Sequence, residues 1–364
     1  MIINKSELSE KLKNLKSVKN VPFEIGGVQG VLYKDGDLYA NNCAIAIRTV
    51  LFDDECPDET FVIPMDAIAF IEKLPNEDVE ITAGKNHEVT VKCGKIKGKF
   101  PGLDPKLFPA TSDENICTSA NIRLAAKDVE QLVGQIMYAC PEKASKPIFQ
   151  GILFDGNGNG INVVACDGYR IAVNKISTTQ QINVVIPREA MQKVLSVIDT
   201  ENDLLIKTEK KQVIISTGDY TVYARLIDGE YINYKQAFPK DSVATFYVNK
   251  KLLADCLARS IICYGNDKGA CGILRGKKGE SVITISNRSK INTFEENITL
   301  DSILAADIEI GFNSKYMIEA VKASKAEDII LQFSSALSPL LVCDGQLRQM
   351  VLPMRLERGG TANA

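Results

Sequence analysis

The feature that most constrains this chain is a repeat with a period of 121 residues. Its three copies are VQGVLY (Val28 to Tyr33), FQGILF (Phe149 to Phe154) and ACGILR (Ala270 to Arg275). The central glycines Gly30, Gly151 and Gly272 are each 121 residues apart. A period of this length is one domain long, so the 364 residues are predicted to form three similar domains.

The same order of elements surrounds each copy. Apolar residues recur three and four positions apart in six segments, which predicts helices over 7–18, 65–74, 125–140, 187–198, 249–264 and 313–324. Between them lie stretches in which apolar and polar residues alternate, such as INVVACDGYRIAVNKI. This alternation favours antiparallel sheets with one solvent-exposed face. Each copy reads as a doubled β-α-β-β-β motif. We therefore predict an α+β fold with domains 1–118, 119–242 and 243–364, ending in a disordered tail, 357–364.

The repeated glycine has a structural interpretation. We expect each domain to need the same close packing where the first strand after the helix passes its neighbour. A second glycine-rich stretch, GNGNG (Gly156 to Gly160), lacks the spacing of a phosphate-binding loop and precedes a strand, so it predicts a hairpin turn.

The composition argues against enzymes that depend on histidine. His87 is the only histidine, which argues against histidine bases and multi-histidine metal sites. The 10 cysteines form no CxxC pair and are expected to be small core residues. We predict no enzyme activity, no metal and no cofactor. With no signal peptide and no apolar run of about 18 residues, a cytoplasmic protein without membrane contact is expected.

Charge is distributed unevenly along the chain. The six predicted helices carry 12 Lys and Arg against 9 Asp and Glu, a net of +3, whereas the whole chain nets −3. If the helices line one surface, that surface is mildly basic and the remainder is acidic. Lysines that simply solvate the helix faces are an equally simple interpretation, and the counts alone favour it.

Three motifs point to one known family. ACDGYRIA (Ala165 to Ala172), GFNSKYMIEAV (Gly311 to Val321) and VLPMRL (Val351 to Leu356) resemble elements of the bacterial DNA polymerase III beta subunit, the sliding clamp. The three-domain repeat and its order are similar as well. The resemblance implies a head-to-tail homodimer that forms a closed ring, with helices lining the hole and antiparallel sheets outside.

The resemblance also implies the function and the partners. The ring would encircle double-stranded DNA without reading its sequence, as a non-catalytic processivity factor of the polymerase. It would tether the DNA polymerase III alpha subunit, the clamp loader and other proteins through their short peptides, which often end in Leu-Phe. A mildly positive lining fits this role, because retention then depends on topology and not on contact energy.

The family's peptide-binding cleft can be carried over by motif. Its predicted residues are Phe149, Gly168, Tyr169, Arg170, Ile171, Ile232, Asn313, Tyr316, Leu337, Pro339, Leu352, Pro353, Met354 and Arg355. An apolar groove with a methionine and a few polar anchors suits short peptides. Without the resemblance, Ile171 and Met354 would read as plain core residues.

The resemblance assigns two further sets of residues. The predicted DNA-facing residues are Lys11, Lys193, Lys250, Arg259, Lys315 and Lys322, and the predicted dimer-interface residues are Phe100, Ile262 and Cys263. Cys263 replaces a larger aliphatic residue of the family. Pro147 and Ile148 stand where aromatic DNA contacts are often found, and Gln236 where a basic residue is frequent.

Two other functions are weighed against a clamp. An enzyme with a small substrate in the cleft is disfavoured by the missing histidines and motifs. A scaffold of clamp fold that binds peptides but no longer loads onto DNA stays open, and retention on circular compared with linear DNA separates it from a clamp.

Overall fold

The computed structural model describes residues 1–16, 18, 29–52, 59–109, 122–209, 211–267, 271–288 and 292–356. The chain divides into two compact units, unit 1 (Met1–Glu130 and Glu189–Ile227) and unit 2 (Gln131–Arg188 and Asp228–Ala364). These units cut through the middle repeat. The predicted boundaries at 118/119 and 242/243 therefore stay predictions. The first boundary and the predicted tail lie outside the described residues.

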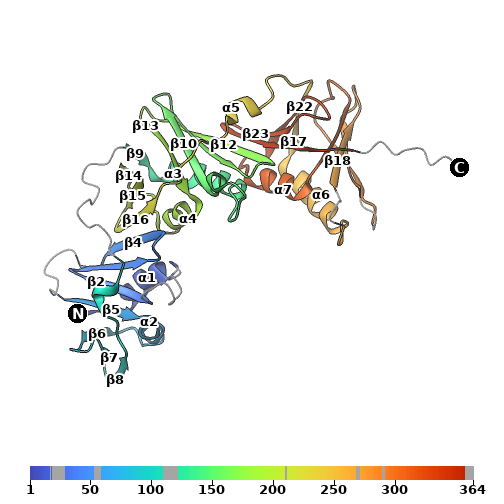
Figure 1. Ribbon diagram of the computed structural model, residues 1–364. Coiled ribbons are helices and arrows are strands. Elements are labelled where there is room, and N and C mark those ends of the chain that lie inside the picture. Colours follow the sequence, from blue (N-terminus) through green and yellow to red (C-terminus); the bar gives the residue numbers. More distant parts are fainter. Residues whose placement is uncertain are drawn as a thin grey trace. The chain divides into compact units, whose positions relative to one another are not determined.

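Unit 1 contains an eight-stranded and a four-stranded antiparallel sheet. The strand orders are β5-β2-β3-β4-β16-β15-β14-β9 and β1-β6-β7-β8 (Figure 1). The strands are β1 (Ile2–Asn4), β2 (Gly30–Lys34), β3 (Asp37–Asn41), β4 (Ile45–Val50), β5 (Thr60–Pro64), β6 (Asp78–Ala83), β7 (Val89–Cys93), β8 (Ile96–Phe100), β9 (Ile122–Ala125), β14 (Asp203–Glu209), β15 (Gln212–Thr217) and β16 (Tyr220–Arg225). Its helices are α1 (Lys5–Lys16), α2 (Met65–Glu72), η2 (Pro105–Leu107) and, apart from its first residue, α4 (Arg188–Val197).

Unit 2 is built on the same plan. Its sheets have the orders β13-β10-β11-β12-β24-β23-β22-β17 and β20-β19-β18-β21-β25. The strands are β10 (Gly151–Asn157), β11 (Ile161–Cys166), β12 (Arg170–Ile176), β13 (Gln181–Pro187), β17 (Ala244–Asn249), β18 (Cys271–Gly276), β19 (Val282–Arg288), β20 (Glu295–Thr299), β21 (Ile308–Phe312), β22 (Asp328–Phe333), β23 (Leu340–Asp344), β24 (Leu347–Val351) and β25 (Pro353–Met354). Its helical segments are η4 (Met137–Ala139), η5 (Pro147–Gln150), α5 (Tyr234–Ala237), α6 (Lys250–Ile262) and α7 (Ser314–Ala323); α3 (Ala126–Ile136) crosses the boundary between the units.

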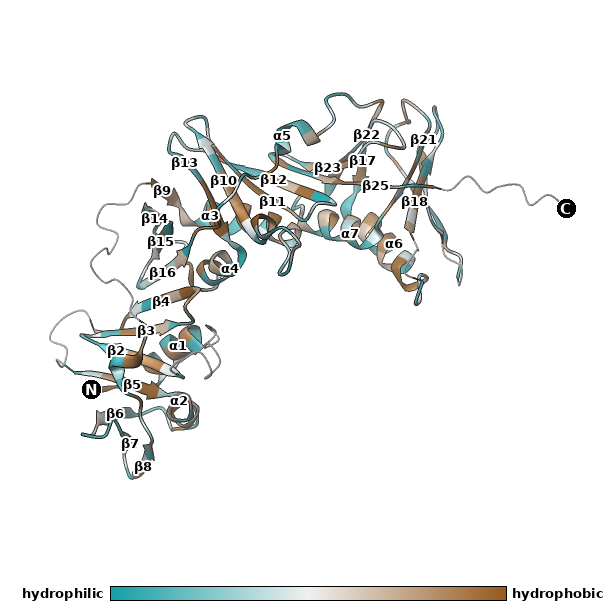
Figure 2. Ribbon diagram, viewed as in Figure 1, coloured by the Kyte–Doolittle hydropathy of each residue, from teal (hydrophilic) through white to brown (hydrophobic). Residues whose placement is uncertain are grey.

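The prediction of an α+β fold with antiparallel sheets is confirmed. All strand pairs in the described part of the chain are antiparallel. Each of the six predicted helices is present to within a few residues of its predicted bounds, although Met137–Ala139 is 3-10 and not α-helical. Hydrophobic residues lie along the strands and the hairpin ends are hydrophilic (Figure 2).

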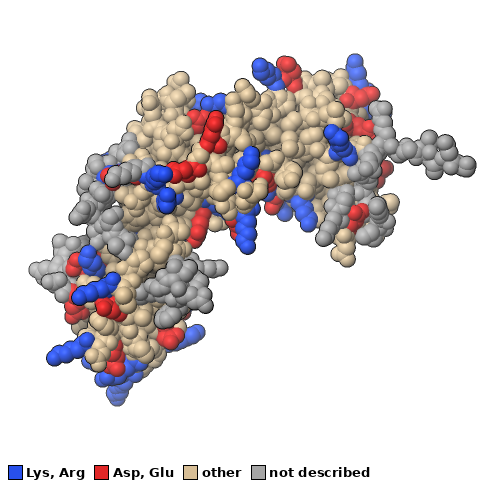
Figure 3. All heavy atoms as spheres, in the orientation of Figure 1, with Lys and Arg blue, Asp and Glu red and all other residues tan. Residues whose placement is uncertain are grey.

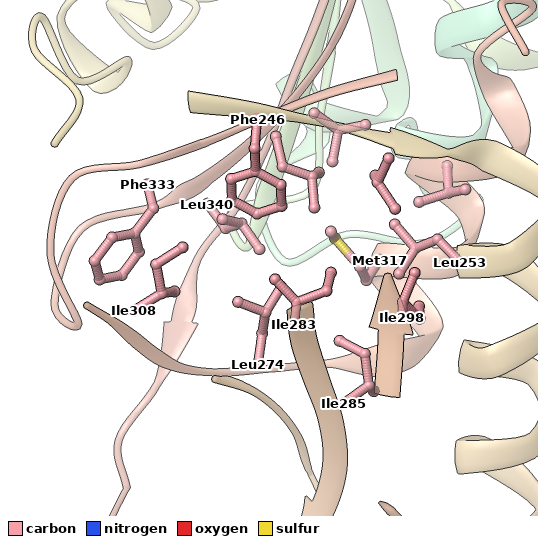
Figure 4. Close-up of a cluster of buried hydrophobic side chains, with 14 of the residues drawn as sticks. Phe246, Leu253, Leu274, Ile283, Ile285, Ile298, Ile308, Met317, Phe333 and Leu340 are labelled. Atoms are coloured by element: carbon pink, nitrogen blue, oxygen red, sulfur yellow. The ribbon is translucent and has the colours of Figure 1, made fainter. Parts of the chain in front are cut away.

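Helix α7 shows why these segments become helices. The Asn313 side chain accepts hydrogen bonds from the backbone N–H groups of Lys315 (2.9 Å) and Tyr316 (3.4 Å), which caps the first turn. Met317 and Val321 are spaced four residues apart and are fully buried. They face a core shared with residues such as Phe246, Leu274 and Ile283, whose side chains point toward one another (Figure 4). Burial of that face holds the helix on the sheet.

The long sheets join strands from adjacent repeats. β4 pairs with β16, placing Ile47 opposite Val222, and β12 pairs with β24, placing Ile171 opposite Met350. These partners are more than 170 residues apart in the sequence, so no local sequence pattern predicts that they pair. Each junction makes one continuous hydrogen-bonded sheet out of two repeats.

The repeated glycine is only partly explained by the packing hypothesis. Gly30 and Gly151 pair with Pro64 and Pro187, the residues immediately before α2 and α4. Gly272 pairs with Phe312, two residues before α7, so the third copy is displaced by one position. A Cβ at Gly30 would lie 2.6 Å from the Ile63 carbonyl oxygen, and one at Gly272 would collide with Ser314 and the Phe312 ring. Close packing is confirmed at both glycines, and the strand pairing at the third copy is displaced by one residue relative to the other two.

The GNGNG stretch forms the predicted hairpin turn. β10 and β11 pair on either side of it, with Gly156 opposite Ile161. Gly158 and Gly160 have φ values of +93° and +99°, which favour glycine.

Candidate functional site

The DGYR sequence forms a tight turn that presents Tyr169 to solvent. The Asp167 carboxylate accepts hydrogen bonds from the backbone N–H groups of Tyr169 (2.8 Å) and Arg170 (3.0 Å). Gly168 lies between them with φ of +92°. This Asx-type turn requires both the aspartate and the glycine. It leaves the Tyr169 side chain exposed while Arg170 enters strand β12 and is buried.

Arg170 is the centre of a group of residues that we call the Arg170 cluster: Tyr138, Asp167, Arg170, Tyr316 and Glu319. The Arg170 Nε donates to Asp167 Oδ2 (2.9 Å), and Nη2 donates to the Tyr138 carbonyl oxygen (2.9 Å). Nη1 pairs with Glu319. The guanidinium lies 4.4 Å from the Tyr316 ring centroid and 5.0 Å from that of Tyr138. The buried charge is therefore both paired and stacked, which is the condition for its burial.

The cluster connects strand β12 to helix α7 and to the C-terminal strands. Tyr169 stacks on Tyr316, with ring centroids 6.3 Å apart and planes inclined by 28°. The Leu352 N–H donates to the Tyr169 carbonyl oxygen (2.9 Å). Asn313 caps α7 and accepts a hydrogen bond from the Tyr316 backbone N–H, so GFNSKY starts this helix beside the cluster. DGYR, GFNSKY and LPMR are thus brought together from three distant parts of the sequence.

Strand β25 fixes the LPMR segment against β21. Met354 lies opposite Gly311 and Pro353 opposite Phe312. A Cβ at Gly311 would lie 2.6 Å from the Met354 carbonyl oxygen and 2.9 Å from Leu356 Cδ2. Glycine at 311 is therefore what allows the C-terminal strand to approach.

An aromatic pair borders the Gly168 side of the site. The rings of Phe149 and Tyr231 meet edge to face, with centroids 6.1 Å apart. A Cβ at Gly168 would lie 3.9 Å from the Phe149 ring, so the turn passes directly over it. Ile232 follows Tyr231 and is half-buried. Phe149 thus lies against the turn on this side, and Tyr231 packs against Phe149.

The remaining predicted cleft residues lie on or beyond the strands around the site, and two of them are exposed. Leu340 lies opposite Val351, so Pro339 and Leu352 are the next residues at that end of the ladder. Ile171 is buried on β12. Leu337 is 79% exposed in the loop between β22 and β23, and Arg355 is exposed beyond β25. The described contacts do not bring Leu337 or Arg355 to the Arg170 cluster.

Two buried cysteines support the floor of the site. The Cys140 Sγ donates to the Phe149 carbonyl oxygen (3.4 Å), and the Gly168 N–H donates to Cys166 Sγ (3.2 Å). Burial raises the pKa of Cys140 to about 12 and that of Cys166 to about 11. These thiols stay protonated at neutral pH and are packing residues, because a nucleophilic cysteine needs a lowered pKa.

Sequence reasoning missed several members of this site. Three of them lie in no motif, namely Tyr138, Tyr231 and Gln349, and Glu319 lies in the GFNSKYMIEAV motif but was not assigned to the site. A helical or strand pattern cannot show that these residues meet. The Tyr138 hydroxyl donates to Gln349 Oε1 (2.7 Å), and burial raises its pKa. The aromatic side chains of Tyr138 and Tyr231 were the only sequence signal that could have identified these two residues as members of the site.

The structure separates the predicted DNA-facing residues into two groups. Lys315 and Lys322 are exposed and form no ion pair in the described part of the chain, whereas Lys11 pairs with Asp219 and Lys250 donates to the Ser324 carbonyl oxygen (3.1 Å). Other exposed helix lysines, which the prediction omitted, are Lys13, Lys127 and Lys251.

Two of the predicted DNA-facing residues differ from the others, and one of them, Lys193, requires correction. Lys193 is only 7% exposed and donates to the Asn14 carbonyl oxygen, and this burial lowers its pKa to about 8. It does not offer a free surface charge. Arg259 is exposed but makes two hydrogen bonds to Glu296, at 2.8 and 2.5 Å. Its charge is directed to the edge strand β20.

The predicted dimer residues lie at the end of helix α6 and at the end of strand β8. Ile262, at the end of α6, is 77% exposed, and Cys263 follows it as the C-cap. Phe100 ends the edge strand β8, and its ring lies 5.3 Å from that of Phe70 on α2. β8 and β20 are the terminal strands of their sheets. Lys and Arg side chains gather at the end of unit 1 that carries β7 and β8 (Figure 3).

Two absences within the described residues bear on other functions. No group of three or more His, Cys, Asp or Glu side chains is arranged to hold a metal ion there. Among the helices in the same ranges, none is long and apolar enough to cross a membrane.

Comparison with known proteins identifies the family. Residues 123–233 match the central domain and residues 235–355 the C-terminal domain of the DNA polymerase III beta subunit. The chain belongs to the DNA polymerase III beta subunit family. These two matches cover more than half of the chain, and they contain the DGYR, GFNSKY and LPMR motifs.

Individual clamps show the same relationship. The chain is 24% identical to the beta sliding clamp of Staphylococcus aureus (strain Mu50 / ATCC 700699) over 296 residues, which is 79% of this chain and 78% of that protein. The crystal structure of the DNA polymerase sliding clamp from Bacillus subtilis is similar, with a TM-score of 0.87, 24% identity and 98% of each chain covered. The beta subunit from DNA polymerase of Streptococcus pyogenes gives a TM-score of 0.89 at 19% identity, over 98% of this chain and 99% of that one. These structures share the fold.

Proposed function

We propose that this protein is a DNA sliding clamp that closes as a head-to-tail homodimer around duplex DNA. It acts as a non-catalytic processivity subunit in the cytoplasm. It tethers the DNA polymerase III alpha subunit, the clamp loader and other DNA-processing proteins through their short peptides. Membership of the beta subunit family and the geometry of the DGYR, GFNSKY and LPMR segments support this assignment.

The observation that carries the ring is the edge-to-edge joining of successive repeats. β4 of the first repeat pairs with β16 of the second, and β12 of the second pairs with β24 of the third. The strands at the corresponding ends of the series are β20 and β8, which are terminal in their sheets. Pairing β20 of one copy with β8 of another continues the rule. A head-to-tail contact of this kind forms a ring when its rotation closes.

The helices supply a mildly basic lining for the ring. Lys315 and Lys322 are exposed on α7 and form no ion pair in the described ranges. Affinity for DNA rises with the number of phosphates neutralised, so a few free lysines attract the duplex without immobilising the protein. Such a lining lets the ring slide, while closure keeps it on the DNA.

The Arg170 cluster supplies the partner site. The exposed Tyr169 stacks on Tyr316 of this cluster, and its carbonyl oxygen accepts from Leu352, which is half-buried like the following Pro353 and Met354. Apolar and aromatic surface with a methionine accommodates short apolar peptides. The residues that we propose to bind these peptides are therefore those of DGYR, GFNSKY and LPMR, with Phe149.

Retention on DNA tests the proposal. The protein is loaded onto nicked circular DNA by a clamp loader and followed in high salt, beside the same DNA cut once. A closed ring stays on the circle and leaves through the ends of the linear form. Equal loss from both substrates refutes encirclement, because a binder held by phosphate contacts is released by salt from either. Peptide binding without retention would identify the scaffold alternative.

A further inference from the structure

A cavity of about 250 Å³ lies within unit 1, where helix α4 meets the end of helix α1 and the start of strand β4. The residues that line it are Val18, Ile45, Glu189, Gln192, Lys193 and Ser196. They belong neither to the Arg170 cluster nor to the terminal strands β8 and β20. The volume is below the roughly 300–1,000 Å³ of sites for drug-sized ligands, so the cavity suits a small molecule.

Helix α4 supplies one side of the cavity. Four of its residues, Glu189, Gln192, Lys193 and Ser196, are spaced three, four and seven positions apart and therefore share one face of the helix. Glu189, Gln192 and Ser196 are exposed, whereas Lys193 is buried. Val18 and Ile45 are buried as well. The cavity thus has a polar mouth and an interior of two aliphatic side chains and one amine.

Hydrogen bonds hold the walls of the cavity in place. The Asn42 side chain accepts from the Ile45 backbone N–H (2.8 Å) and donates to Glu189 Oε1 (3.3 Å). This links the start of β4 to the mouth. The Ser196 hydroxyl donates to the Lys193 carbonyl oxygen (2.7 Å). The site is therefore formed before any ligand binds, as most small-molecule sites are.

The Lys193 amine is held at the end of α1. It donates to the carbonyl oxygen of Asn14, one of the last four of α1, whose carbonyls lack an intrahelical donor. Burial lowers the pKa of Lys193 to about 8. Glu189, on α4 itself, is the other ionisable residue among the described residues that line the cavity. The groups that α1 and β4 place there, the Asn14 carbonyl and the Ile45 side chain, carry no charge.

A lysine in these surroundings has a characteristic reactivity. Desolvation favours the unprotonated amine, which is the nucleophile that condenses with carbonyl compounds. We propose that Lys193 is a carbonyl-reactive lysine that forms an imine with small uncharged aldehydes entering this cavity. The short alkyl group of the aldehyde would pack on Val18 and Ile45. This modification site is separate from DNA encirclement and from peptide binding.

The reaction needs no oxidant, reductant or cofactor. The unprotonated Nζ adds to the carbonyl carbon, the two amine protons leave with the carbonyl oxygen as water, and a C=N bond replaces C=O. The imine nitrogen then takes up one proton. The resulting iminium keeps one N–H and a positive charge, so it can still donate to the Asn14 carbonyl at the negative end of α1.

The charges around the cavity favour an uncharged electrophile. The Glu189 carboxylate at the mouth repels anionic acyl donors such as acyl phosphates. Acylation would also neutralise Lys193 permanently and remove the cation from the end of α1. An aldehyde adduct avoids both effects and is reversible by hydrolysis.

Trapping with borohydride tests the proposal. The full-length protein is equilibrated with propanal at pH values from about 6 to about 10, imines are reduced, and propylation of each lysine is measured by peptide mass spectrometry. At pH 8, about half of Lys193 is unprotonated, compared with about 0.3% of a lysine at the ordinary pKa of 10.5. Lys193 should therefore carry up to about 100-fold more adduct, with a half-maximum near pH 8.

Two variants identify the modified amine. Lys193→Arg should remove the adduct that forms first in wild-type protein, whereas Lys13→Arg, at an exposed position on α1, should retain it. Melting temperatures show whether both variants are folded, and the wild-type map decides the question if Lys193→Arg is not. Adducts spread evenly over the exposed lysines, a half-maximum for Lys193 near pH 10.5, or an unchanged first adduct in folded Lys193→Arg would each overturn the proposal.

Discussion

The substitution Gly311→Ala tests whether strand β25 holds the partner site in place. The added methyl group would lie 2.6 Å from the Met354 carbonyl oxygen and 2.9 Å from Leu356 Cδ2. One obstacle is backbone and cannot rotate away, so strand β25 has to move. Overpacking of this kind costs about 1–3 kcal/mol. If that cost falls on docking of β25, the ratio of undocked to docked strand rises about 5- to 150-fold.

The assay is binding of a fluorescent peptide that ends in Leu-Phe, followed by anisotropy. Because LPMR is part of the proposed site, the apparent affinity should fall as the docked fraction falls. The dimer should persist, since Gly311 lies at neither β8 nor the free edge of β20. Gly134→Ala is the matched control: nothing lies within 4 Å of its added Cβ, and alanine in a helix is favoured over glycine by about 1 kcal/mol. Unchanged peptide affinity and melting temperature in Gly311→Ala would refute the reasoning.

Three further predictions concern single side chains. Burial lowers the Lys193 pKa to about 8 from 10.5, so its charge costs the folded state about 3 kcal/mol below pH 8, and this cost disappears as the pH rises toward 10.5. The stability of Lys193→Met relative to wild type should therefore be greater at pH 7 than at pH 9.5 by about 2 kcal/mol, measured by paired thermal melts, and a difference independent of pH would contradict the lowered pKa. Ile262→Asp should abolish the dimer in sedimentation experiments without lowering the melting temperature of the monomer. The side chain is 77% exposed in one chain, whereas in the ring the aspartate would be a buried unpaired charge. An intact dimer would show that Ile262 is not in the interface. Tyr169→Ala removes the exposed ring that stacks on Tyr316 and should weaken peptide binding several-fold with a stability change within about 0.5 kcal/mol, so an unaltered peptide affinity would exclude Tyr169 from the site.

Local patterns were sufficient to predict the helices and the antiparallel strands. Helix α7 follows from Asn313 as a cap and from apolar residues three and four positions apart, all within a few residues of one another. The family motifs identified DGYR and LPMR as partners in one site. They could not show that Arg170 is buried between two tyrosine rings, because Tyr138 lies 32 residues away in the sequence and in no motif.

The number of charged residues on the predicted helices was less informative than the position of each side chain in the fold. Lys193 and Arg259 looked like surface cations because they lie on predicted helices, yet one is buried and the other is held by Glu296. A helix presents only part of its surface to solvent, and the sequence does not show which carboxylate a long side chain reaches. Similarly, the ACGILR copy matches its counterparts in letters but pairs one residue out of register.

The sequence alone determined the repeat, the antiparallel α+β class and the family, since each depends on neighbouring residues or on short motifs. The tertiary structure decided how the repeats join, which lysines stay free and which side chains meet at the site. These properties depend on contacts between residues that are tens to hundreds of positions apart. A strand's partner is chosen by which edge is brought beside it, and that geometry exists only once the chain has folded.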